Sequence, residues 1–356
     1  MKVVICGGGM MGCSVAYHLT LKGITPTIVE RCGIACAASG KAGGFLAKDW
    51  CDSSPVGPLA RKSFQMHVQL AETFPNCDYR KLDTLSVSAK EGANPRKGNL
   101  IDWVDGPILS QHSIGTTKTT AQVHPRKLVE SMFTAAKAKG ADLHMGTVEG
   151  IEFSASRDKV TGVKVDGQIL AADVVVIAMG PWSKQASQWL PIPAIGSFRG
   201  HSITLIPEGP VTPHALFTEV ATKADLPREP EFYPRPDGEV YICGMGDSEE
   251  LPSDPSKVVP NMDSCKALHK QAGVVSTRLQ AAKVGVQQVC HIPYSPDNVP
   301  LIGRVPGVEG AYIAAGHGVW GILNGPATGA ALADLIVDGK TSLLDMSAFD
   351  PVRFSK

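Results

Sequence analysis

Three glycines and one acid near the N-terminus have the spacing of a dinucleotide-binding site. The glycines form the pattern Gly7-x-Gly9-x-x-Gly12, and Glu30 follows the last of them after 18 residues. Glycines at this spacing let the backbone approach a pyrophosphate whose charge lies at a helix N-terminus. An acid about 20 residues further on accepts hydrogen bonds from a ribose diol and repels a 2′-phosphate. The residues therefore predict a bound dinucleotide that lacks a 2′-phosphate.

The elements around these residues are the ones that such a site needs. Residues 2–6 are apolar or β-branched without alternation, which is typical of a strand buried on both faces. Residues 14–22 have helical spacing and stop before Gly23, and residues 25–30 indicate a second strand. The N-terminal segment therefore predicts one strand–helix–strand unit, with Glu30 at the end of its second strand.

The rest of the chain has two kinds of pattern. Segments typical of strands and helices in an α/β layout cover residues 126–139, 142–145, 150–153, 160–165, 173–178, 311–315 and 324–338. Alternating strands prevail between residues 195 and 288, at 202–206, 231–234 and 239–243. We predict a mixed α/β fold in which a Rossmann-like, nucleotide-binding domain is discontinuous and a second domain is mainly antiparallel β. The predicted bounds are 1–82, 121–195 and 286–356 for the first domain, and 83–120 and 196–285 for the second.

Composition restricts the classes of partner. Lys plus Arg and Asp plus Glu both number 34, so the formal charge is zero, which argues against nucleic acid or an anionic membrane as the main partner. Hydrophobic residues make up 43% and charged residues 19%, as in a globular chain with a sizeable core. No apolar stretch has the length of a membrane span. We expect a small-molecule substrate, no membrane, and a monomer or homodimer.

The nine cysteines predict reduced, mostly buried thiols. Cys32 and Cys36 alone have a ligand-like spacing, and no second Cys or His pair at finger spacing follows them, so we expect no metal. These features favour a reducing compartment, either the cytoplasm or the lumen of an organelle. The chain opens on a strand and not on a signal segment, and a chain from which a transit peptide had been removed would look the same.

Further glycine-rich turns decide which dinucleotide is expected. Residues 39–45 read Ser-Gly-Lys-Ala-Gly-Gly-Phe, and residues 316–322 read Gly-His-Gly-Val-Trp-Gly-Ile after the segment 300–303, Pro-Leu-Ile-Gly. In this order the motifs resemble the D-amino-acid oxidase superfamily of FAD-dependent oxidoreductases, on its glycine-oxidase and sarcosine-oxidase side. The sequence resembles in particular a branch of fungal and plant FAD-dependent oxidoreductases. The resemblance covers nearly the whole chain and implies FAD and an FAD-binding domain of the glutathione-reductase type.

The resemblance implies contacts with each part of FAD. It matches the first glycine turn to the pyrophosphate, Glu30 to the adenosine ribose, and the backbone of Val148 to adenine. It matches the loop at 39–45 to the ribityl chain and isoalloxazine, and the loop at 316–322 to the pyrimidine edge of the flavin. The residues placed against the cofactor are Gly7, Gly9, Met10, Met11, Gly12, Glu30, Arg31, Ser39, Lys41, Ala42, Gly43, Gly44, Phe45, Val148, Ala178, Gly180, Trp182, Cys290, Gly316, Gly318, Val319, Trp320, Gly321 and Ile322.

A helix predicted to start near residues 324–326 would follow the last of these loops. Proline suits the first turn of a helix, because its missing N–H is not needed there, and Pro326 fits this position. Reduced flavin carries negative charge at its N1 and C2 oxygen. The free N–H groups and positive end of the helix would stabilise that charge.

Two positions depart from the resemblance. Amino-acid oxidases of this group hold the substrate carboxylate with an Arg that matches Ile292, and sarcosine oxidases use a Lys that matches Leu323. Both positions are apolar here, and an apolar side chain cannot make the two hydrogen bonds of a bidentate Arg. The departures disfavour ordinary small amino acids as substrates. They favour a more hydrophobic amine, or an amine without a free carboxylate.

Cys290 matches the cysteine that sarcosine oxidases attach covalently to the flavin 8α-methyl group, because it stands seven residues before Asp297. Two alternatives are open for it. Cys290 is either a covalent link to FAD or a buried thiol packed in a strand. The link needs a thiolate, and neighbours on a strand point to opposite faces, so His291 is a poor candidate for the helping cation.

The sequence offers several candidates for the catalytic face of the flavin. Lys48 and Trp50 follow the loop at 39–45 and are expected to face the substrate as a cation and an aromatic wall. His291 and Trp320 flank the flavin-side strands. Tyr233 is expected to pack in the antiparallel sheet, with a place in the cavity wall as the alternative. His317 either takes part or packs in the glycine loop.

The resemblance implies an enzyme that transfers a hydride from a C–N bond of an amine or an imino- or amino-acid-like substrate to flavin N5. Molecular oxygen is the expected acceptor, with hydrogen peroxide as the product. This chemistry belongs to the cofactor and needs no dedicated acid or base when the amine enters neutral. The alternatives are a flavin dehydrogenase with another acceptor, and an FAD-binding trafficking or assembly protein with little turnover.

Overall fold

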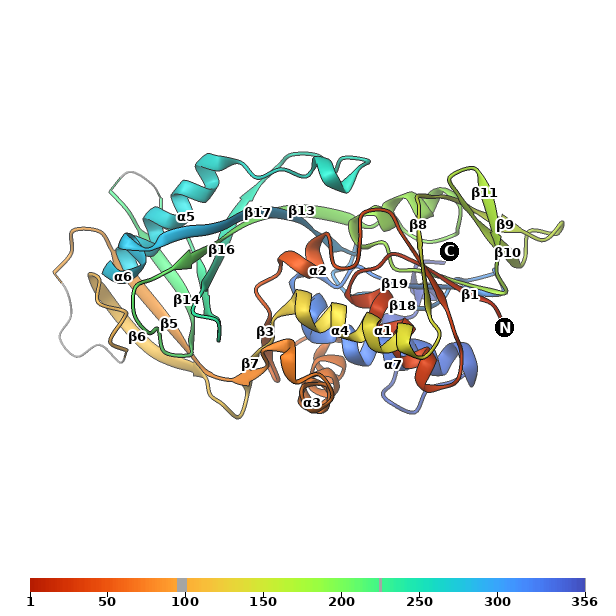
Figure 1. Cartoon of the computed structure of the whole chain (residues 1–356), viewed down its shortest axis with the longest axis horizontal. Coiled ribbons are helices and arrows are strands. Elements are labelled where there is room, and N and C mark those ends of the chain that lie inside the picture. The colour runs from red at the N-terminus through yellow and green to blue at the C-terminus, as the bar shows by residue number, and fades with distance from the viewer. Residues whose placement is uncertain (95–100, 224–225, 356) are drawn as a thin grey trace.

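The computed structural model describes residues 1–94, 101–223 and 226–355. Figure 1 shows an elongated molecule in which a helix-rich half carrying both termini joins a half dominated by one large sheet. The two long strands β13 (Gly196–Ile206) and β17 (Lys283–Tyr294) run side by side from one half to the other. None of the described helices is both long and apolar enough to cross a bilayer.

A six-stranded sheet forms the centre of the helix-rich half. Its order is β18-β19-β12-β1-β2-β8, and the bounds are Leu301–Arg304, Ala311–Ala315, Val174–Ile177, Val3–Cys6, Thr27–Glu30 and Asp142–Met145. All neighbours are parallel except β18 and β19. The alternating residues of β1 face two cores. Val3 and Ile5 pack in the helix-side cluster, whereas Val4 and Cys6 pack in the cluster of the opposite face.

Helices and a small sheet cover those two faces. The helix side is formed by α1, α3, α4 and α7, whose bounds are Met10–Leu21, Gly57–Thr73, Pro125–Ala138 and Gly321–Val337. The other face packs against a sheet of order β11-β10-β9, with bounds Gln168–Ala171, Val160–Val165 and Val148–Phe153. Apolar residues fill both interfaces, and this explains why the central strands lack alternation.

The second half is built on a seven-stranded sheet. Its order is β17-β13-β16-β15-β14-β5-β6, and the bounds not yet given are Val240–Asp247, Glu231–Pro234, His214–Ala221, Asp83–Lys90 and Ile108–Gly115. Only β14 and β5 pair in parallel. Helices α5 (Met262–Val275) and α6 (Thr277–Ala281) pack on one face. The predicted domain bounds stay a prediction, and β17 crosses the one placed at residue 286.

Short elements link the two halves. A sheet of order β3-β7-β4 comprises Phe45–Ala47, Thr120–Gln122 and Arg80–Lys81, and the short helix α2 comprises Ala38–Lys41. The segment Gly180–Gln188 forms a 3₁₀ helix after β12. These connections place the ends of the central strands beside the large sheet.

The structure confirms the predicted mixed α/β fold, and it corrects one helix start. Helix α7 begins at Gly321, directly after a 3₁₀ turn at Gly318–Trp320, and not near residues 324–326. Pro326 therefore lies inside the helix and not in its first turn. The sequence predicts a loop over residues 316–322, whereas Gly318–Trp320 is a 3₁₀ turn and Gly321 and Ile322 belong to α7.

Candidate functional site

A cavity of about 510 Å³ lies at the carboxyl ends of four parallel strands and against the large sheet. Gly7, Glu30, Ala178 and Gly316 line it, and each ends or directly follows one of the strands β1, β2, β12 and β19. Ligands of open α/β sheets bind outside the carboxyl ends of the strands. The cavity is therefore where the fold type places a nucleotide.

The first glycine turn is too tight for any side chain at two of its positions. Gly7 has φ of +111°, and a Cβ there would lie 2.3 Å from the carbonyl oxygen of Ala178. A Cβ on Gly12 would lie 1.9 Å from the oxygen of Gly7. Gly9 caps α1 without a side chain, and the first helical turn carries no acid. The N-terminus of α1 therefore presents its N–H groups without a competing carboxylate, which suits a pyrophosphate.

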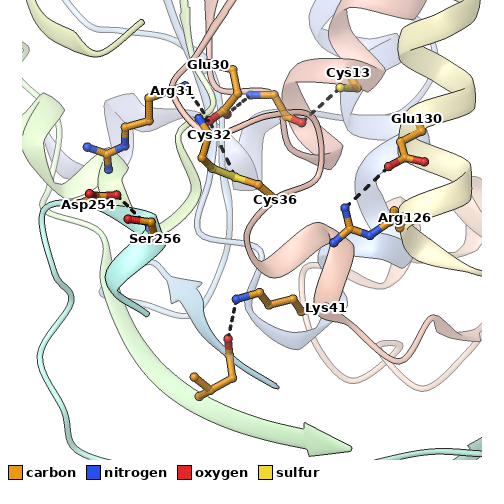
Figure 2. The surroundings of a disulfide bond; sticks show 12 residues. Cys13, Glu30, Arg31, Cys32, Cys36, Lys41, Arg126, Glu130, Asp254 and Ser256 are labelled. Carbon is orange, nitrogen blue, oxygen red and sulfur yellow. Dashed lines mark hydrogen bonds and ion pairs between the residues drawn. A yellow bond between two sulfur atoms is a disulfide. The ribbon is translucent and has the colours of Figure 1, made fainter. Parts of the chain in front are cut away.

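Glu30 is held in place by three backbone donors. The N–H of Gly8 donates to one carboxylate oxygen at 2.7 Å, and those of Arg31 and Cys32 donate to the other at 2.8 and 2.9 Å. Figure 2 shows Glu30 beside the Cys32–Cys36 pair, which closes the loop that follows β2. Charge-assisted bonds of this kind fix the orientation of a carboxylate. Glu30 is thus fixed at the cavity wall, where a ribose diol could reach it.

Cys32 and Cys36 form a disulfide, and this corrects the expectation that all nine cysteines are reduced. The other seven cysteines are free. Both half-cystines line the cavity beside Glu30. The two sulfurs and the Glu30 carboxylate also lie close enough together for a metal-ligand group. In the disulfide, however, the two sulfurs bond to each other and are not thiolate ligands.

Trp182 and Val148 line the end of the cavity next to Glu30. The indole N–H of Trp182 donates to the carbonyl of Pro252 at 2.8 Å, and the guanidinium of Arg31 lies 5.1 Å from the centre of the indole ring. Val148 opens β9 and is buried. An apolar valine and a fixed aromatic wall suit a purine base.

The short helix α2 ties the glycine loop to the large sheet. The ammonium of Lys41 donates to the carbonyl of Val289 at 3.0 Å. In return, the carbonyl of Lys41 accepts from the Tyr241 hydroxyl at 2.9 Å and from the Gln288 amide at 3.0 Å. Lys41 is therefore occupied in joining the two halves and is not among the residues that line the cavity.

The C-terminal loop and the start of α7 form the opposite wall of the cavity. Gly316 has φ of +80°, and a Cβ there would lie 3.0 Å from the amide nitrogen of Ser295. Helix α7 starts after Trp320 with no side-chain cap and no acid in its first turn. His317 is buried against the Thr328 hydroxyl at 3.0 Å, and burial lowers the pKa of its imidazole to about 3. His317, with a neutral imidazole, and the start of α7 therefore line the cavity at this edge.

Aromatic rings form the wall between this edge and the large sheet. Phe45 stacks on Tyr233 with ring centres 5.5 Å apart and meets Phe217 edge-on at 5.0 Å. Trp50 packs against Phe217 at 4.8 Å and against Trp320 at 6.4 Å. Four of the five rings line the cavity, whereas Trp50 supports them from behind. Tyr233 meets both expectations, because it packs in the buried cluster on the sheet and also lines the cavity.

Arg199 lines the cavity on the large sheet but is already paired. Arg199 is 2% exposed, and its guanidinium bonds to Asp247 at 3.0 Å and to Glu249. Ile292 lines the cavity with an apolar side chain, and Leu323 is buried in the helix-side core. Within the described residues of the cavity wall, no unpaired arginine or lysine lies near the aromatic rings. The cavity therefore lacks a carboxylate anchor of the expected kind.

Cys290 also lines the cavity, from the end of β17. Burial raises the pKa of its thiol to about 11, and the charge of Lys41 opposes this rise. Lys41 is thus the cation near Cys290 that the sequence did not identify. Its charge does not compensate for burial, so the thiol is protonated at neutral pH.

The structure gathers most residues of the predicted site around one cavity. Five of them do not line it, namely Gly12, Lys41, Lys48, Trp50 and His291. His291 is buried, with its Nδ1 3.3 Å from the Ser197 hydroxyl. Several residues of the large sheet line the cavity without having been proposed as site residues, among them Phe217, Glu231, Tyr241 and Cys243. The alternation of β15 could have found Glu231, because it shares a face with Tyr233.

The cavity fits an FAD molecule on three counts. A glycine turn lies at a helix N-terminus, a fixed acid follows at the end of the second strand, and the start of α7, which has no acid in its first turn, lies at the far wall. A family model described as "DAO: FAD dependent oxidoreductase" matches residues 2–335. The chain belongs to this family of FAD-dependent oxidoreductases. It is therefore an enzyme of the DAO family with FAD as its cofactor.

Individual proteins match along nearly the whole chain. An oxidoreductase of Schizosaccharomyces pombe is 32% identical over 98% of this chain and 97% of its own length. Glycine oxidase of Pseudomonas putida is 24% identical over 98% of each chain. Among solved structures, glycine oxidase from Geobacillus kaustophilus superposes with a TM-score of 0.82 at 22% identity and covers 99% of each chain. The last likeness shows the shared fold.

Proposed function

We propose that this DAO-family enzyme oxidises a C–N bond of an amine, or of an imino- or amino-acid-like substrate, with molecular oxygen as acceptor and hydrogen peroxide as product. When bound, FAD supplies the oxidant, because its N5 accepts a hydride from carbon. The observation that carries the proposal is the continuity of the cavity. It runs from Glu30 and Trp182 to an aromatic wall and a sheet that bears polar side chains.

The chain's own residues account for binding and orientation. Glu30 would accept hydrogen bonds from the adenosine ribose, and the N-terminus of α1 would hold the pyrophosphate. Gly43 to Phe45 and the start of α7 would enclose the isoalloxazine, with N–H groups at its pyrimidine edge. Phe217 and Tyr233 would exclude water from the substrate, because both rings line the cavity.

Two experiments test the proposal. The purified enzyme should be yellow, and anaerobic addition of an amine or imino acid from a broad panel should bleach it. The reduced enzyme, mixed rapidly with oxygen, should regain its colour and release peroxide in equal amount. Slow reoxidation by oxygen with fast reoxidation by a quinone would assign a dehydrogenase instead. Persistent colour with every panel member would contradict amine oxidation altogether.

A further inference from the structure

Glu231 is a carboxylate on the cavity side of the large sheet. Its strand β15 alternates, so Phe232 is fully buried in the core under α5 while Glu231 and Tyr233 line the cavity. Register places Glu231 between Phe217 of β14 and Cys243 of β16. The carboxylate therefore lies in the same surface as the aromatic rings described above.

One carboxylate oxygen is occupied and the other is not. Oε2 accepts from the Tyr233 hydroxyl at 2.5 Å and from the Cys243 thiol at 3.5 Å. Across the described residues, no hydrogen bond reaches Oε1, and this atom is not fully buried. Oε1 is therefore an accessible acceptor inside a cavity, and Tyr233 and Cys243 fix its position.

The charges around Glu231 leave it without a counter-ion from the chain. The titratable groups closest to it are Tyr233, Tyr241, Cys243, Cys290 and Lys41, whereas Glu219 of β14 and Asp247 of β16 do not line the cavity. The Lys41 ammonium is bonded to the carbonyl of Val289, and Arg199 is paired with Asp247 and Glu249. A carboxylate in such surroundings is stabilised by a cation that enters with a ligand.

We propose that Glu231 binds the ammonium group of the substrate through Oε1 and takes one proton from it, and that the substrate is an amine with an apolar body and no carboxylate. This inference rests on the proposed function and names the substrate class. In the proton step an N–H bond of the ammonium breaks, an O–H bond forms on Glu231, and the electron pair stays on nitrogen. The step involves no change of oxidation state, and it leaves the neutral amine that loses a hydride readily.

Two further observations agree with this role. Burial raises the pKa of the Glu231 carboxyl, while the hydrogen bonds from Tyr233 and Cys243 oppose the rise, so the group is a better proton acceptor than an exposed glutamate. The rings of Phe45, Phe217 and Tyr233 offer faces and edges to an apolar body, and aromatic faces also attract an ammonium. Ile292, in place of an arginine, would repel a carboxylate by leaving it unpaired.

The test compares benzylamine with phenylglycine, which differs from it by a carboxylate, on the FAD-loaded enzyme. We expect benzylamine to perturb the flavin spectrum and to reduce the flavin, and phenylglycine to bind at least tenfold more weakly. In Glu231→Gln, reduction by benzylamine at pH 7 should slow roughly 100-fold. This loss of rate should shrink as the pH approaches the pKa of the benzylamine ammonium group, because the substrate then enters neutral. Glu219→Gln, an exposed acid on β14, is the matched control and should equal wild type.

The outcomes separate this inference from the proposed function. If phenylglycine binds and reduces the flavin better than benzylamine, amine oxidation stands and the assignment of Glu231 is overturned. If Glu231→Gln binds benzylamine as tightly as wild type, the assignment is also overturned. If benzylamine binds through Glu231 and no amine reduces the flavin, the cation site stands and the proposed function fails. Retention of FAD colour shows that the variant is folded, and Glu231→Asp, which keeps the charge but shortens its reach, serves if the Gln variant is colourless.

Discussion

His67 supplies to Ile322 the hydrogen bond that Pro326 cannot give. Inside α7, the carbonyl of Ile322 would accept from the N–H of residue 326, which proline lacks. The Nε2 of His67 lies 3.1 Å from the carbonyls of both Ile322 and Leu323, so it carries the hydrogen. The next N–H, that of Ala327, donates to the Ser63 hydroxyl at 3.1 Å. Ser63 and His67, which lie one turn apart on α3, thus supply the hydrogen-bond partners that the backbone of α7 lacks around Pro326.

We expect His67→Leu to lower the free energy of unfolding by about 1–3 kcal/mol, because it leaves a buried carbonyl unpaired. His67→Gln keeps a donor and should lose less. Burial lowers the pKa of His67 to about 4. The unfolded chain therefore takes up the proton first, and the stability present above pH 6.5 is lost as the pH falls towards 4, by roughly 3 kcal/mol at most. Thermal melts across this range should show a weaker acid dependence in His67→Gln than in wild type.

Gly43 should tolerate no side chain while Tyr233 is present. A Cβ at residue 43 would lie 2.5 Å from the Tyr233 ring and 2.9 Å from that of Tyr241. Gly43→Ala should cost about 1–3 kcal/mol through overpacking and should shift the flavin spectrum. Adding Tyr233→Leu makes room, so the double variant should recover part of the melting temperature that Gly43→Ala loses. Additive losses in this double-mutant cycle would argue against a direct contact.

Glu30→Gln should weaken FAD retention. The variant replaces a charged acceptor with a neutral one at the cavity wall, at a cost of roughly 1–3 kcal/mol, or about 5- to 150-fold in the FAD dissociation constant. Titration of the apoenzyme with FAD measures this constant. Glu149→Gln, an acid of the same half that pairs with Lys164, is the control and should bind FAD as wild type does. Equal affinity in the two variants would remove Glu30 from the ribose site.

Acid precipitation should release the flavin, because we expect no covalent bond between Cys290 and FAD. Its thiol has a pKa raised to about 11 by burial, so thiolate is scarce at neutral pH despite the neighbouring Lys41. We expect the yellow colour in the supernatant of acid-precipitated wild-type enzyme. Colour that stays in the wild-type pellet and moves to the supernatant in Cys290→Ser would establish the covalent link to FAD instead.

The disulfide predicts a definite thiol count. Denatured, unreduced enzyme should titrate with seven thiols, and the reduced enzyme with nine. The double variant Cys32→Ser, Cys36→Ser should give seven in both states. Because the N–H of Cys32 donates to Glu30, opening this loop should also weaken FAD binding modestly. Nine thiols before reduction would show the pair to be open in solution.

Sequence reasoning succeeded where the signal is local. The strands Asp142–Met145, Glu231–Pro234 and Ala311–Ala315 have the predicted bounds, because turn residues flank short apolar runs. The start of α7 was missed because a helix that contains Pro326 depends on donors from α3, more than 250 residues away in sequence. The disulfide was missed because spacing alone does not show how a loop folds.

The candidate site also has one part with a local sequence signal and one part without such a signal. Glycine turns and Glu30 carry a recognisable spacing, so their place together in the cavity wall was predictable. Glu231 and Phe217 come together only through the register of β14, β15 and β16, which no spacing in the sequence encodes. Lys48, proposed to face the substrate, donates its backbone N–H to the carbonyl of Thr119 and does not line the cavity.

The strand order of the central sheet has a consequence for synthesis on the ribosome. Val3 of β1 pairs with Val174 of β12, and Val175 pairs with Ala311 of β19. The emerging chain therefore holds an apolar strand edge unpaired until its second half appears, and sheet edges of this kind invite aggregation. The walls of the cavity are complete only when residues 316–322 have been made. We therefore expect FAD to be loaded late in synthesis, after residues 316–322 have been made.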